Sequence, residues 1–200
     1  RIVKNNNNSY LVSFKTVTEA VLCALKIQFK FKYVTPKFDP TIRMLKIGLG
    51  SGVPVTDKAN IFEEATTLAT RMCEVMDGQL IISSEVKSLY ESENRNTIID
   101  ETSVRVLHPS EEKFLTHLMD YIESNWNKPN FNVSNFSIEM GYSKSQLYRK
   151  LKNLTGKSSN NFIREFRLHK ALSLLHKQRG NISEIAYETA KTFLNGTIDD

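Results

Sequence analysis

The sequence predicts an α+β protein, with an N-terminal αβ sandwich followed by an all-α C-terminal part. Between residues 4 and 107, short apolar or alternating runs typical of strands occur between runs with helical spacing, so that a mixed or antiparallel sheet with helices is expected. From residue 109, apolar residues keep helical spacing. The expected boundary is at His108 and Pro109, because proline disfavours helix in the residue before it.

Composition fits packed cores in a cytoplasmic chain. The chain has 200 residues, of which 40% are apolar, and a net charge of +5. No apolar run reaches the roughly 18 residues of a membrane span, and the start has no secretory signal pattern. Cys23 and Cys73 lie in helical patterns, which indicates reduced, buried thiols. Because the chain does not begin with Met, it is expected to be part of a longer protein.

The first strand is expected at residues 9–14, after a run of turn-forming asparagines at residues 5–8. Thr16 or Thr18 caps the next helix, whose exit at residues 26–33 is basic and aromatic. This exit is interpreted as a helix end docked on a sheet. Stacking on single-stranded nucleic acid is the alternative.

A second strand, residues 44–48, leads into Gly48, Gly50 and Gly52. A phosphate-binding glycine loop would need a helix directly after it. Residues 53–55 instead read as extended chain, and prolines 36 and 40 place a loop before the strand. A glycine-marked bend or bulge in the sheet is therefore expected.

Four further elements complete the N-terminal half. Residues 60–75 carry apolar side chains at helical spacing, and residues 79–83 read as a short buried strand. Ser84 is expected to cap a helix that runs through residue 89. The alternation at residues 103–107 predicts the last strand.

This half resembles a known family. The motifs are A-T-T-L-A-T-R-M at residues 65–72 and G-Q-L-I-I-S at residues 78–83. With the order of strands and helices over residues 4–107, they resemble the later two-thirds of a class III adenylate/guanylate cyclase homology domain. The resemblance implies that residues 1–108 form a cyclase-like sensor or dimerisation domain, incomplete at its N-terminus.

The resemblance also implies a degenerate site. Active members of the family have two metal-binding aspartates, the first of which would lie before residue 1. The second falls at Asn8, and an amide lacks the charge to hold Mg²⁺ beside a triphosphate. The ribose-orienting Asn aligns with Thr67, the phosphate-binding Arg with Arg71, and the base-reading pair with Lys4 and Asn60. The chain is therefore expected to be no enzyme, with no catalytic residues, metal or cofactor. The alternative is a nucleotidyl cyclase-type enzyme or a nucleotide-binding sensor.

The histidines do not change this expectation. They are His108, His117, His169 and His176, and no pair has the i, i+4 spacing of helical metal ligands.

A helix-turn-helix pattern stands in the C-terminal half. A short amphipathic helix from residue 132 ends at Gly141, and a polar turn at residues 142–144 leads into a second helix, residues 145–154. Thr155 and Gly156 close the second helix. The apolar residues of the second helix fall at i, i+4 and i+7 and form its expected buried stripe: Leu147, Leu151 and Leu154.

The other face of the second helix has no acid. Between residues 142 and 180, ten basic residues stand against one acid, Glu165. One-signed surfaces favour a polyanionic partner, whereas a basic face that is simply solvated is the alternative. The basic residues are Lys144, Arg149, Lys150, Lys152, Lys157, Arg164, Arg167, Lys170, Lys177 and Arg179.

Residues 141–175 resemble the first helix-turn-helix and the linker helix of AraC-type transcription regulators. The resemblance rests on the G-Y-S turn, the S-Q-L-Y-R-K-L-K core, the L-T-G stop and the R-L-H-K-A-L-S-L-L linker. Ser137 stands where Ala is usual, and Ser159 where Pro is frequent at the first turn of the linker helix.

This resemblance implies a bacterial-type regulator that binds double-stranded DNA with residues 145–154 in the major groove. It implies Ser145, Tyr148 and Arg149 as base readers, with Gln146 as a further candidate, and Lys144, Lys152 and Arg164 as phosphate contacts. Contact with RNA polymerase is a family implication. Self-association is expected through the N-terminal domain, and no membrane partner is expected.

The DNA-binding domain is expected to span residues 109–200. Residues 110–126 fit its first helix, with Ser110 as the cap, and residues 181–189 resemble the supporting helix of a second helix-turn-helix. There the match fails, because Ala190 stands where the turn glycine is usual and residues 191–200 do not resemble the second recognition helix. The second helix-turn-helix is therefore expected to be truncated.

Overall fold

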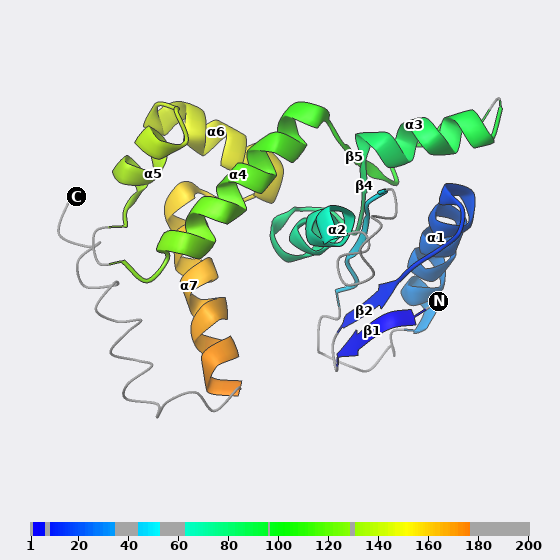
Figure 1. The fold of residues 1–200 in the computed structure, drawn as a ribbon, viewed down its shortest axis with the longest axis horizontal. Helices are drawn as coiled ribbons and strands as arrows, with labels where there is room; N and C mark the ends of the chain where they lie inside the picture. Colours follow the sequence, from blue (N-terminus) through cyan, green and yellow to red (C-terminus); the bar gives the residue numbers. More distant parts are fainter. Residues whose placement is uncertain are drawn as a thin grey trace. The chain divides into compact units, whose positions relative to one another are not determined.

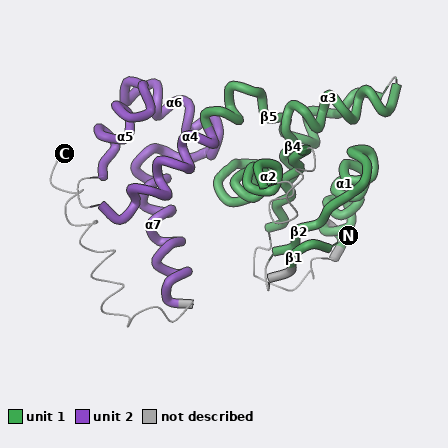
Figure 2. Tube along the Cα trace, in the orientation of Figure 1, with its two compact units in different colours: residues 1–114 green, residues 115–200 purple. Residues whose placement is uncertain are grey.

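The computed structural model describes residues 2–6, 9–34, 44–52, 63–95, 97–128 and 131–176 (Figure 1). The chain divides into two compact units, residues 1–114 and 115–200 (Figure 2). This division falls inside helix α4 (Pro109–Asn125), so the expected domain limits of 1–108 and 109–200 stay a prediction.

Several expected features lie outside the described residues. They are Asn8, the two prolines at 36 and 40, the extended chain at 53–55, the first turn of the helix expected from residue 60, and everything after residue 176, including the second helix-turn-helix.

The described residues of unit 1 form two sheets. Strands β1 (Ile2–Asn6) and β2 (Ser9–Val12) form an antiparallel hairpin. Strands β3 (Ile47–Leu49), β4 (Leu80–Ser83) and β5 (Arg105–Leu107) form a sheet in the order β3-β4-β5. The combination of helices with these sheets agrees with the α+β prediction.

Two expectations for the strands need correction. The three-stranded sheet is wholly parallel rather than mixed or antiparallel. Its consecutive strands are joined through helices, and a helical crossover returns the chain in the same direction. Asn5 and Asn6, expected in a turn, belong to β1, because the strand at Ser9–Val12 has an unpredicted partner.

Three helices flank the parallel sheet: α1 (Val17–Val34), α2 (Glu63–Val75) and α3 (Ser84–Glu93). Leu80 and Ile82 of β4 are buried together with Val21 of α1 and Val86 of α3. Because side chains alternate along a strand, the other face is free to pack against α2. In Figure 1, α1 and α2 lie on opposite sides of the sheet.

Two glycines allow α2 to approach the sheet closely. A Cβ atom at Gly48, which lies in β3, would be 2.4 Å from the carbonyl oxygen of Ala69, and one at Gly50 would be 2.6 Å from that of Ala65. Both oxygens belong to the backbone of α2, which cannot move independently of the helix. The expectation of a glycine-marked bend is therefore wrong at Gly48, which lies within strand β3 and needs to be glycine because a helix packs on it.

Replacing Gly48 by alanine is expected to lower the free energy of unfolding of unit 1 by about 1–3 kcal/mol, since the new methyl group overpacks the contact between β3 and α2. Urea unfolding measures the loss. The control is Ser51→Ala, which removes one exposed hydrogen bond to Glu85 and should change the stability by no more than about 0.5 kcal/mol. Equal stabilities of the two variants would contradict this account of the glycine.

Helix starts differ slightly from expectation. The hydroxyl of Thr16 accepts the N–H of Glu19 at 3.2 Å and so caps α1, as predicted. Ser83 caps α3 instead of Ser84, whose N–H and hydroxyl donate to Glu112 at 2.8 and 2.9 Å. Helix α4 already begins at Pro109, so Ser110 is inside the helix and not its cap.

Two of the aromatic residues near the end of α1, Phe29 and Tyr33, are not docked on the sheet. Phe29 and Tyr33 are 62% and 74% exposed, with ring centroids 5.1 Å apart. Both side chains are largely exposed, so the predicted docking is wrong for these two. The thiols of Cys23 and Cys73 are free and half-buried rather than buried. Burial raises the pKa of Cys73 above its ordinary value.

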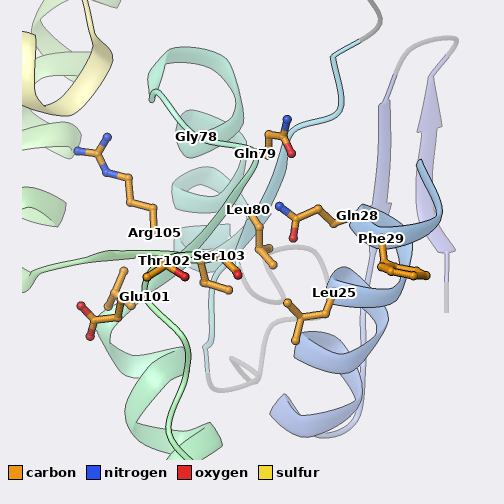
Figure 3. A pocket seen from close by; sticks show the side chains of 12 residues that line it. Leu25, Gln28, Phe29, Gly78, Gln79, Leu80, Glu101, Thr102, Ser103 and Arg105 are labelled. Carbon is orange, nitrogen blue, oxygen red and sulfur yellow. The ribbon is translucent and has the colours of Figure 1, made fainter. Parts of the chain in front are cut away.

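Unit 1 also holds an open pocket of about 800 Å³ between α1, β4 and the chain before β5 (Figure 3). Leu25, Gln28 and Phe29 line one side. The charged residues of the other side are already engaged, because Glu101 pairs with Lys87 and Arg105 donates to the carbonyl of Asp77.

Unit 2 is all helical over its described residues. After the C-terminal part of α4, it consists of α5 (Val133–Glu139), α6 (Lys144–Thr155) and α7 (Ser159–His176). The apolar residues Phe114, Leu115, Leu118, Met119 and Ile122 of α4 are buried, whereas Trp126, which follows the helix, is half-buried. The aromatic rings of Tyr121, Phe131 and Phe136 pack with centroids 5.5–5.8 Å apart. No helix among the described residues of the chain is long and apolar enough to cross a membrane.

Candidate nucleic-acid interface

The turn between α5 and α6 is built around Gly141. Its φ of +70° is left-handed, and the N–H of Tyr142 donates to the carbonyl of Ser137 at 2.9 Å. The N–H of Gly141 donates to the carbonyl of Ile138 at 2.9 Å, which completes a Schellman motif. The predicted glycine turn is therefore confirmed, and its chemistry is local: only glycine adopts this backbone without strain.

Helix α6 is capped at both ends. The hydroxyl of Ser143 accepts the N–H of Gln146 at 3.2 Å, while the amide oxygen of Gln146 accepts the N–H of Ser143 at 3.0 Å. This capping box starts the helix at Lys144, one residue before the prediction. Gly156, with φ +73°, ends it.

The two faces of α6 divide as the spacing predicts. Leu147, Leu151 and Leu154 are at most 1% exposed. The opposite face is exposed and carries most of the predicted DNA contacts: Lys144, Ser145, Gln146, Tyr148, Arg149 and Lys152. The buried leucines fix the rotation of the helix, so this face is presented to solvent as one surface.

Some predicted contacts have partners within the protein. Gln146 belongs to the capping box, and the ammonium group of Lys152 donates to the carbonyl of Gly156 at 2.7 Å. Lys150 lies over the ring of Tyr142, 5.1 Å from its centroid. Arg164, the predicted contact outside α6, is exposed on α7. The exposed side chains of Ser145, Tyr148 and Arg149 lie together on the first two turns of α6.

The basic surface is smaller than the sequence count indicates. Arg167 is only 7% exposed, and its guanidinium donates to the carbonyls of Trp126 at 2.9 Å and Phe131 at 3.0 Å. Burial lowers the pKa of Arg167 from its ordinary value. Lys157 pairs with Glu165. Arg167 therefore links α7 to the segment between α4 and α5, and it does not belong to the exposed basic residues.

A small cavity that the sequence did not predict lies beside this face. It has a volume of about 270 Å³ and is lined from three helices: by Val133 of α5, by Lys144, Ser145 and Tyr148 of α6, and by Ser158, Ser159 and Asn160 at the start of α7. Three predicted DNA contacts are thus brought together with the beginning of the linker helix. The serine pair before the apolar run of α7 was the available signal, since it marks a helix start.

The residues that the cyclase resemblance implies as a nucleotide site differ in their exposure. Arg71, the expected phosphate-binding residue, is 9% exposed and lies in the buried part of α2. Thr67 and Lys4 are exposed, while Asn8 and Asn60 lie outside the described residues. Among the described residues, no three His, Cys, Asp or Glu side chains are grouped as metal ligands would be.

Comparison with known proteins found similarity over part of the chain. Residues 136–190 match the model of a helix-turn-helix domain family. The chain is 37% identical over 78 residues to histidine kinase P4 of Formosa agariphila, in an alignment that covers 39% of this chain and 6% of that relative's length. No solved structure matches.

The family match does not reach residues 4–107, so the cyclase resemblance has no support from it. It does support the AraC-type resemblance from α5 onward, and it agrees with the capped helices and glycine turn of unit 2. Residues 136–190 are therefore similar to a helix-turn-helix domain, which supports DNA-binding transcription regulation in general.

Proposed function

We propose that this chain binds double-stranded DNA sequence-specifically as part of a transcription regulator, with α6 inserted in the major groove. One observation carries the proposal. Helix α6 buries its three leucines completely and presents an exposed face without any acidic residue. A helix of this width fits the major groove, and its long cationic and amide side chains can reach base edges and phosphates.

The roles follow from side-chain chemistry and position. Arg149 is the strongest base reader, because a guanidinium can donate two hydrogen bonds to guanine. Ser145 and Tyr148 lie next to it on the exposed face and contact neighbouring bases. Gln146 reads a base once its amide leaves the capping box. Lys144, Lys152 and Arg164 hold phosphates, which positions the helix without reading sequence.

Unit 1 has a different role in this proposal. It receives a signal or joins two copies of the chain, and it carries out no catalytic step. The burial of Arg71 supports a structural rather than a nucleotide-binding role for that residue. Contact of the regulator with RNA polymerase belongs to the same proposal as the family implication.

A salt titration tests the phosphate contacts. Lys152→Ala should weaken binding to specific and random duplex alike, and should flatten the plot of log K against log salt by about 0.9, since one fewer counterion is released. Fluorescence anisotropy with labelled duplexes measures both slopes. Lys26→Ala, at an exposed lysine of α1 in unit 1, is the matched control and should leave the slope unchanged.

Two outcomes would contradict the proposal. Equal slopes for Lys152→Ala and the wild type would remove this lysine from the interface. Absence of duplex binding by the wild-type chain at low salt would overturn the proposed function itself.

A further inference from the structure

The small cavity beside α6 has the features of an anion site, and the inference drawn from it rests on the proposed function. The first residues of helices α6 and α7 line it. Lys144 and Ser145 are the first two residues of α6, and Ser159 and Asn160 are the first two residues of α7. The first N–H groups of a helix have no partner within that helix, and the helix dipole places positive partial charge there.

The cap of α7 leaves these donors available. The hydroxyl of Ser158 accepts the N–H of Asn161 at 3.3 Å, and the carbonyl of Ser158 accepts the N–H of Phe162 at 2.9 Å. The N–H groups of Ser159 and Asn160 precede those of Asn161 and Phe162 in the chain. They have no carbonyl one turn back within the helix to which they could donate. Both residues line the cavity together with the exposed cation Lys144.

A second observation points to a ligand. Ser159 is 4% exposed and lines the cavity, yet its hydroxyl oxygen has no hydrogen-bond partner among the described residues. Buried polar atoms are nearly always hydrogen-bonded, so an unpartnered hydroxyl on a residue that lines the cavity points to a bound group as its partner. The hydroxyl can donate one hydrogen bond, which suits an acceptor such as a phosphate oxygen.

We infer that this cavity is a subsite for one DNA backbone phosphate. The hydroxyl and N–H of Ser159 and the N–H of Asn160 donate to its unesterified oxygens, and Lys144 neutralises its charge. The volume of about 270 Å³ leaves room for bridging waters beside the phosphate. Tyr148 and Ser145 line the same cavity. A phosphate held here therefore fixes the position of α6 along the groove.

The subsite depends on the residue type at position 159. A proline there would keep the helix start, because proline suits the first helical position. It would, however, have neither the N–H nor the hydroxyl. Serine supplies both donors, and its buried hydroxyl then has no partner within the part of the chain that the structure describes.

Three variants on α7 test the inference. Ser159→Ala removes the hydroxyl, Ser159→Pro removes the hydroxyl and the N–H, and Ser173→Ala is the matched control at an exposed serine of the same helix. We expect a loss of affinity for duplex DNA of about tenfold for Ser159→Ala and a larger loss for Ser159→Pro, since hydrogen bonds to a charged group are removed. The control should bind as the wild type does. Thermal unfolding should show Ser159→Ala at least as stable as the wild type, which separates lost contacts from lost folding.

A duplex series with a single neutral methylphosphonate at each backbone position supplies the second readout. The wild type should lose affinity at one linkage next to the α6 contact, and Ser159→Ala should be insensitive to substitution at that linkage. If the Ser159 variants bind like the wild type, or if their sensitivity to each linkage is the same, the subsite is overturned while the proposed function stands. If the wild type binds no duplex at low salt, both the phosphate subsite and the proposed function are overturned.

Discussion

Replacing Arg149 by alanine should cost about 1–3 kcal/mol of binding free energy at the specific DNA site, with a much smaller loss on random duplex. The exposed guanidinium lies on the face of α6 opposite the buried leucines, where a groove-inserted helix meets base edges. Its two-pronged hydrogen bonding to guanine is available at the correct base pair and is lost at others. The variant should therefore lose discrimination at one position of the site.

The measurement is a competition assay against duplexes that each carry one base-pair change in a site selected from a random pool. Lys150→Ala is the matched control, because Lys150 is the neighbouring cation on α6 but lies over the Tyr142 ring. That variant should keep the pattern of base preferences. Equal losses on specific and random DNA for Arg149→Ala would exclude this residue as a base reader.

The second large effect concerns stability. Arg167→Ala should lower the free energy of unfolding of unit 2 by about 3 kcal/mol or more, since each hydrogen bond from a charged donor contributes about 1.5–3 kcal/mol. Two such bonds are lost, and the carbonyls of Trp126 and Phe131 lose their donor. The cation also packs over the Phe131 ring, with its central carbon 5.5 Å from the centroid.

Arg164→Ala, on the same helix, is the control, for which we expect unchanged stability and weaker DNA binding. Arg164 is exposed, so its replacement should leave the stability of unit 2 within about 0.5 kcal/mol of the wild type while weakening DNA binding. Urea unfolding can be followed through Trp126, the one tryptophan of the chain. If the two arginine variants had equal stability, the structural role of Arg167 would be wrong.

The helix-turn-helix could be predicted closely because its signals are local. Ser143 and Gln146 form the capping box that starts α6, and the glycines at 141 and 156 take the left-handed backbone that ends α5 and α6. The leucine spacing sets which side of α6 is buried. Each of these features involves residues within one or two turns of each other, so the order of residue types determines them.

The N-terminal unit could be predicted less well. Apart from β1, its order of strands and helices was recognisable, but the direction of the strands was not, since alternation along a strand does not reveal its neighbour. The same holds for Gly48, whose need for glycine comes from the backbone of α2. Phe29 and Tyr33 show the converse, because an aromatic residue type does not by itself determine burial.

By itself, the sequence determined the local structure of the helix-turn-helix: helix α6 follows a glycine turn, is capped, has no acidic residue and carries its leucines on one side. Only the tertiary structure decided how its polar groups are used. It buries Arg167 against carbonyls from residues 36 and 41 positions away and leaves Arg164 exposed. It also gathers Lys144, Tyr148 and the unpartnered hydroxyl of Ser159 around one cavity. The physical reason is that hydrogen bonding within a helix turn depends on near neighbours, whereas burial and charge environment depend on what the folded chain brings from far along the sequence.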